Sequence, residues 1–156
     1  MTLNPETDLV LTRDINAPCA LLYKCWTTPE HLVHWFVPKP HKVIACELDV
    51  RPGGKCNTTF DVDGTEMPNN GVYLEVIPNE KIVFTDTYTE GWAPKPDPFM
   101  TAIITFEDIG NGRTRYTATV RHRTPEAAKT HVDMGFYGGW GTATDQLEAY
   151  AQGLPK

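Results

Sequence analysis

The chain has 156 residues, 40% of them hydrophobic and 22% charged, with a formal net charge of −6. A chain of this length buries about 70% of its unfolded surface, so we expect a single domain over residues 1–156. The acidic balance and the scattered Lys and Arg residues argue against nucleic-acid binding. Without a run of ~20 apolar residues or a signal-peptide pattern, we expect a cytoplasmic protein with no membrane span.

The first 36 residues carry the signals of one strand and two short helices. Apolar and polar side chains alternate over Asp8–Asn16, which is typical of a strand. Pro18 favours the first turn of a helix, and apolar side chains recur at helical spacing as far as Trp26. Thr28 and Pro29 supply the cap and first turn of a second, shorter helix.

The middle of the chain has the pattern of an antiparallel meander. Its turns are short, and the clearest of them, Arg51–Gly54, requires φ > 0 at Gly53 or Gly54. Short turns make consecutive strands antiparallel neighbours. Six runs rich in β-branched and aromatic residues are predicted as strands: Lys42–Val50, Lys55–Val62, Asn70–Ile77, Lys81–Tyr88, Phe99–Ile109 and Thr114–His122.

One longer link and the last helix have special features. The link Thr89–Pro98 contains three prolines and Trp92, which predicts a stiff flap whose indole covers an apolar pocket. Thr124 caps a final helix that continues to Tyr150. Its interior glycines, among them Gly139, predict a kink near Trp140 or close packing onto the sheet.

Five short motifs share one order and spacing with a known family. The motifs are Trp26–Leu32, Trp35-Phe36, Arg51–Gly54, Gly71–Pro78 and Gly138-Gly139-Trp140. In these residues the chain resembles the activator-of-heat-shock-chaperone-ATPase-like branch of the START-like superfamily, also called SRPBCC. The resemblance implies an α+β helix-grip fold, in which a curved antiparallel sheet of about seven strands surrounds a long C-terminal helix, with two short helices after the first strand.

The resemblance also implies a function and its alternatives. The superfamily uses a cavity between sheet and helix, so we expect a small hydrophobic or amphipathic ligand there and no cofactor. A regulatory contact with a chaperone ATPase is the first alternative. The second is a cyclase or hydrolase acting on an apolar substrate, for which the branch supplies no shared catalytic residue. The sequence is also compatible with a homodimer and does not fix the oligomeric state.

The candidate ligand-binding residues are mostly aromatic. In a chain of this size each of them also suits plain core packing. The candidates for the cavity wall are Trp35, Phe36, Phe60, Phe84, Tyr88, Trp92, Met134 and Trp140.

Polar candidates for catalysis are few. Strand alternation places Asp86 and Tyr88 on one face and His122 on the inward face of the last strand, where each could instead be structural. His31 and His34 lack the further ligands that a metal requires, so no metal site is expected. The four cysteines have no paired metal-binding spacing and are predicted to be reduced, buried thiols.

Overall fold

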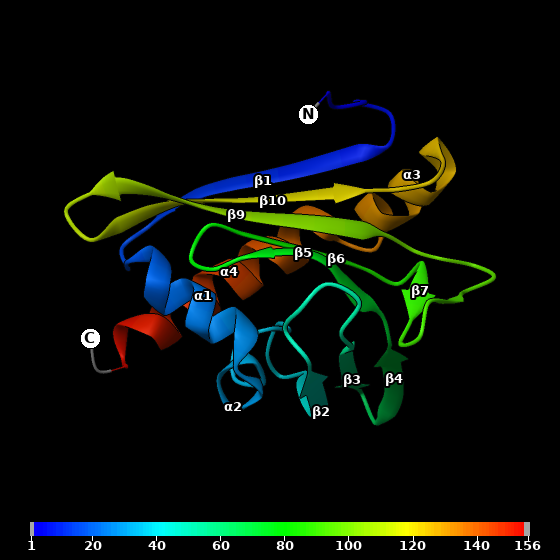
Figure 1. Cartoon of the computed structure of the whole chain (residues 1–156), viewed down its shortest axis with the longest axis horizontal. Helices are drawn as coiled ribbons and strands as arrows, with labels where there is room; N and C mark the ends of the chain where they lie inside the picture. Colours follow the sequence, from blue (N-terminus) through cyan, green and yellow to red (C-terminus); the bar gives the residue numbers. More distant parts are fainter. Residues whose placement is uncertain (1, 155–156) are drawn as a thin grey trace.

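Long antiparallel strands form the main layer of the computed structural model, which describes residues 2–154 (Figure 1). The sheet has five strands in the order β1-β10-β9-β6-β5. The first strand therefore pairs with the last, with Leu9 opposite Val120, so two strands about 100 residues apart in the sequence are neighbours in the sheet. The strands are β1 (Asp8–Ile15), β10 (Arg113–Arg121), β9 (Thr101–Gly110), β6 (Lys81–Thr85) and β5 (Val72–Ile77).

A second, three-stranded sheet continues from the edge of β5. Its order is β2-β3-β4, and its link to β5 is a single bridge between Lys55 and Val72. The strands are β2 (Lys42–Leu48), β3 (Cys56–Val62) and β4 (Thr65–Asn69). The flap adds a ribbon of two short strands, β7 (Tyr88–Thr89) and β8 (Ala93–Pro94).

The α+β fold with mostly antiparallel strands is confirmed, but the predicted meander of about seven strands is divided between two sheets. Strand β4 was absent from the prediction because Pro68 interrupts its pattern. Pro68 is tolerated because β4 is an edge strand, where one side of the backbone needs no partner. Strand β6 ends at Thr85, three residues before the predicted end.

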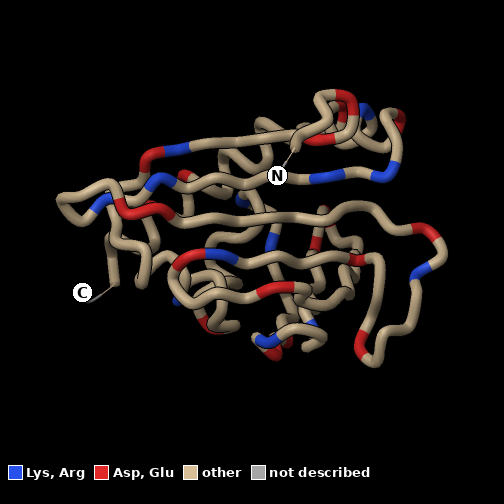
Figure 2. The backbone as a smooth tube through the Cα atoms, turned by 45° about the horizontal axis from the view of Figure 1, so that its top comes forward, with Lys and Arg blue, Asp and Glu red and all other residues tan. Residues whose placement is uncertain are grey.

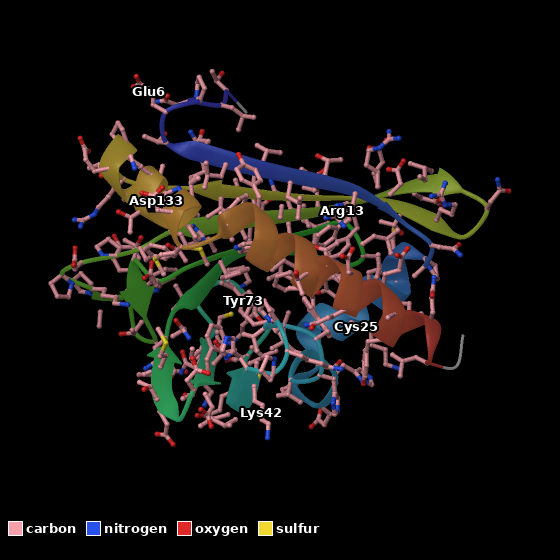
Figure 3. All side chains as sticks on the ribbon, turned by 180° about the vertical axis from the view of Figure 1, so that it is seen from behind. Glu6, Arg13, Cys25, Lys42, Tyr73 and Asp133 are labelled. Atoms are coloured by element: carbon pink, nitrogen blue, oxygen red, sulfur yellow. The ribbon has the colours of Figure 1, made fainter. Side chains whose placement is uncertain are left out.

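Four helices accompany the sheets: α1 (Cys19–Thr27), α2 (Pro29–Leu32), α3 (Pro125–Asp133) and α4 (Phe136–Gln152). The hydroxyl oxygen of Thr124 accepts a hydrogen bond from the Ala127 backbone nitrogen, as its predicted role as a cap requires. The single predicted helix is broken at Gly135, whose φ of 97° is left-handed, and not near Trp140. Seen from behind, α4 crosses the face of the sheet (Figure 3).

The core lies where α1 and α4 meet the five-stranded sheet. Buried side chains from both helices and from β6, β9 and β10 form one continuous cluster. Trp26 of α1 lies at its centre, with its ring 5.0 Å from that of Trp35. The fully buried members include Leu22, Cys25, Ile82, Ile104, Ala118 and Leu147.

The glycines of the hairpin and of α4 differ in the space around them. Gly53 has φ 81°, which confirms the predicted turn. A Cβ at Gly54 would lie 1.9 Å from the carbonyl oxygen of Asp49. At Gly138 and Gly139 a Cβ would meet no described atom within 4 Å, so the predicted close packing of these glycines is wrong.

We expect Gly54→Ala to lower the free energy of unfolding by about 2 kcal/mol or more, because the methyl group collides with a backbone atom that can move only with the hairpin. Gly138→Ala should raise it by about 0.4–1 kcal/mol, because alanine at this exposed position in the first turn of α4 restricts the unfolded chain more than glycine does. Urea unfolding of both variants measures the two effects. A Gly54→Ala protein as stable as wild type would contradict this account of the hairpin.

Candidate functional site

An open groove lies between the second half of α4 and the segment that links α2 to β2. Its volume is about 840 Å³. Lys42, at one end of the lining segment, points outward from the start of β2 (Figure 3). The lining residues are Val33, His34, Val37, Lys39, Pro40, His41, Lys42, Val43, Gln146, Ala149 and Tyr150.

Gln146 of α4 holds the linking segment in place. Its side-chain nitrogen donates to the carbonyl oxygens of Trp35 and Val37 at 3.0 and 2.8 Å. Its side-chain oxygen accepts from the backbone nitrogen of Lys39 at 3.0 Å. One amide therefore satisfies three backbone groups of an irregular segment, which gives the groove a defined wall.

Tyr150 connects α4 to α2 at the other end of the groove. Its hydroxyl lies 2.7 Å from Nδ1 of His31, and its ring is stacked on that of His34 with centroids 5.3 Å apart. Burial raises the pKa of Tyr150 above its ordinary value. The hydroxyl stays protonated at neutral pH and serves as a hydrogen-bonding group.

The interior between the sheet and the second half of α4 is filled by side chains. Trp26, Tyr116 and Leu147 are buried there. The indole nitrogen of Trp26 is buried with no partner at hydrogen-bond geometry among the described residues. These side chains occupy the interior at this level, where the ligand was predicted, whereas the groove opens on the flank of α4.

Four of the predicted ligand-binding residues gather around Trp26. The rings of Trp35, Phe36 and Phe84 lie 5.0–5.8 Å from that of Trp26. Phe60 of β3 lies 5.9 Å from Phe36, which joins the second sheet to this aromatic cluster. Trp35 is buried, whereas the three phenylalanines are half-buried.

The other predicted ligand-binding residues lie elsewhere. Trp92 is 55% exposed, with its ring 5.7 Å from that of Tyr88, and it lies against Gly53 of the hairpin. Met134 is 68% exposed at the end of α3. Trp140 packs on Phe136 within α4 at 5.9 Å. None of these side chains lines the groove, and Trp92 lies against the hairpin rather than over the groove.

Asp86 organises the flap. Its carboxylate accepts hydrogen bonds from the backbone nitrogens of Phe99 and Met100 at 2.8–3.0 Å. Lys95 lies 3.3 Å from the same carboxylate. Both oxygens are engaged in holding the two ends of the flap together, so this carboxylate has a structural function in the fold.

His122 forms a buried pair with His131 of α3. Nδ1 of His122 lies 2.9 Å from the carbonyl oxygen of Thr7, so this nitrogen carries the proton. Nε2 of His122 then accepts from Nδ1 of His131 at 2.9 Å. Phe99 packs on the His131 ring at 4.7 Å. Burial, followed by the proximity of His122, lowers the pKa of His131 from 6.5 to about 4.

The cysteines and histidines assemble no metal centre. All four cysteines are free, and burial raises the pKa of Cys25 and of Cys46 to about 11. Among residues 2–154 no three His, Cys, Asp or Glu side chains converge as a metal ion requires. In this same part of the chain, no helix combines the length and apolar character needed to cross a bilayer.

Comparison with known proteins places the fold and these residues in a family. The model of the "Activator of Hsp90 ATPase homolog 1-like protein" family matches residues 16–152. The chain belongs to this family. The match includes α1, the whole groove lining and both C-terminal helices.

Several solved structures superpose along almost the whole chain. A Nitrosomonas europaea protein is 38% identical, with a TM-score of 0.92 over 96% of this chain and 97% of that one. A Chromobacterium violaceum protein is 25% identical, with a TM-score of 0.76 over 96% and 99%. A Mycobacterium smegmatis protein, 24% identical, has a TM-score of 0.80 over 97% and 94% and shares the fold. A comparison with curated proteins finds no match.

The groove residues that the sequence prediction missed come from two distant parts of the family domain. His34, Val37 and Lys39 follow α2, whereas Gln146 and Tyr150 lie in α4, more than 100 residues later. The one local signal was the sequence Val37-Pro38-Lys39-Pro40-His41, whose prolines exclude a regular helix; the structure forms a turn here, closed by the hydrogen bond from the His41 nitrogen to the Pro38 oxygen. A wall becomes a groove only when α4 packs opposite it.

Stability should decrease as the pH falls from about 6.5 to about 4. The folded pKa of His131 lies below that of the unfolded chain, so the unfolded state takes up the proton first. The gap corresponds to a loss of about 3 kcal/mol at most, complete below pH 4. Urea unfolding at several pH values should show this slope, and in His131→Asn, which keeps a donor near Nδ1, a flatter one. An equal slope in the variant would contradict the assignment.

Gln146→Glu should lower the free energy of unfolding by about 1–3 kcal/mol, because a carboxylate would face the carbonyl oxygens of Trp35 and Val37 with no proton to donate. Gln152→Glu is the matched control, since that side chain makes one long hydrogen bond at 3.3 Å on the surface. Thermal melts compare the two variants. Equal melting temperatures would show that the Gln146 amide does not hold the segment.

Proposed function

We propose that this protein binds a small amphipathic molecule in the groove between α4 and the segment 33–43. The observation that carries the proposal is an open hollow of about 840 Å³ whose wall is fixed by the three hydrogen bonds of Gln146. Small-molecule sites are concave, largely pre-formed and mainly apolar, with a few placed polar groups. The groove combines Val33, Val37 and Val43 with polar side chains in this way.

Packing supports the groove over the interior as the place of binding. A ligand beneath the second half of α4 would have to displace Tyr116 or Leu147, which are buried in the core. Removing such contacts costs several kcal/mol. A ligand in the groove displaces only water, because its lining side chains already border open space.

The aromatic cluster is the second candidate position for the same function. Phe36, Phe60 and Phe84 are half-buried and belong to different elements, so a flat apolar molecule could enter between them. Regulation of a chaperone ATPase, which the family description suggests, is the alternative that the test below addresses.

The test is a fluorescence titration with a neutral, environment-sensitive dye such as Nile red. The wild-type protein should bind the dye saturably, and Ala149→Trp should weaken binding about tenfold, since the indole fills the groove. Thr142→Trp, an exposed position on the same helix, is the matched control and should bind as wild type does.

Two outcomes would contradict binding in the groove. Loss of dye binding in Phe60→Ala with normal binding in Ala149→Trp would place the ligand in the aromatic cluster. A wild-type protein that binds no dye would overturn the ligand-binding function and favour an interaction protein.

A further inference from the structure

The polar side chains of the groove are basic or neutral. Lys39, His41 and Lys42 lie close together in the sequence along one wall, and His34 stands on the same wall nearer to α2. Among the described lining residues there is no Asp or Glu. This is unusual for a chain with a net charge of −6, in which acidic residues outnumber basic ones.

The two lysines of the groove also have no carboxylate partner among residues 2–154. Elsewhere, Lys and Arg lie scattered among Asp and Glu along the backbone (Figure 2), and most of them form ion pairs. Within residues 2–154 the cations without a carboxylate at ion-pair distance are Lys24, Lys39, Lys42 and Arg113. Half of these line the groove.

Unpaired lysines beside an apolar wall favour a ligand that has both an anionic group and an apolar part. An ammonium group attracts an anion more strongly next to low-dielectric protein than in bulk water. The valines on the same wall, Val37 and Val43, offer apolar surface within the same hollow. The backbone nitrogen of Lys39 is already bonded to Gln146, so recognition of a charge falls to the side chains.

We propose that the groove binds an apolar molecule with an anionic head group, a carboxylate or a phosphate, with the head at Lys39 and Lys42 and the apolar body toward Tyr150. The proposal rests on the proposed ligand-binding function and adds the chemical class of the ligand. An overall negative protein repels anions at long range, so the local pair of lysines confers the selectivity.

The experiment compares three probes that share a ten-carbon chain and differ only in the head group: decanoate, decan-1-ol and decan-1-amine. Each displaces the neutral dye from the wild-type protein at a concentration below micelle formation. Decanoate should bind about tenfold more tightly than the alcohol, and the amine more weakly than the alcohol. Decyl phosphate, as a fourth probe, distinguishes a phosphate head from a carboxylate.

The variant Lys39→Gln/Lys42→Gln should remove the preference for decanoate over decanol, because decanoate loses far more affinity than decanol does. Lys24→Gln removes another unpaired cation, outside the groove, and should keep the preference. The preference should also shrink as salt is raised from 0.05 to about 0.5 M, because screening weakens exposed charge pairs.

The outcomes separate this proposal from the one on which it rests. Equal affinity for all three probes, or a preference that survives in the double variant, overturns the anionic head group and leaves ligand binding intact. Failure of every probe to displace a bound dye also overturns the anionic head group alone, whereas a wild type that binds no dye overturns both proposals.

Discussion

The structure depends on the packing of α4 across the five-stranded sheet. Leu147 of α4 enters the same buried cluster as Ile104 of β9 and Tyr116 of β10. Burial of each large apolar side chain contributes about 1.5–3 kcal/mol, so this contact supplies much of the stability that the domain has. The pairing of β1 with β10 completes the surface on which the helix lies.

The position of α4 in turn creates the groove. With Leu147 directed into the core, Gln146 and Ala149 lie on the flank of the helix, opposite the segment that follows α2. Three hydrogen bonds from Gln146 order a segment that has no strand or helix of its own. The packing of the core therefore sets the direction of Gln146 and, through it, the wall of the groove.

Two polar arrangements secure the opposite end of the molecule. Asp86 binds backbone nitrogens at the far end of the flap. The pair His122 and His131 ties β10 to α3 and to the N-terminal segment through Thr7. Both replace water by internal hydrogen bonds, and their buried groups are satisfied chiefly by the backbone. The candidate catalytic residues of the sequence, Asp86 and His122, are used by the fold in this way.

The sequence by itself determined the elements that local chemistry controls. The Gly53 turn, the Thr124 cap, the six strand regions and the inward direction of His122 follow from φ preference, capping and strand alternation. The motifs were also sufficient for the family. Tertiary structure decided what depends on distant partners: the division into two sheets, the edge strand β4, the break at Gly135, and the groove. Its walls lie more than 100 residues apart, and side-chain spacing carries no information on which flank of a helix meets which segment.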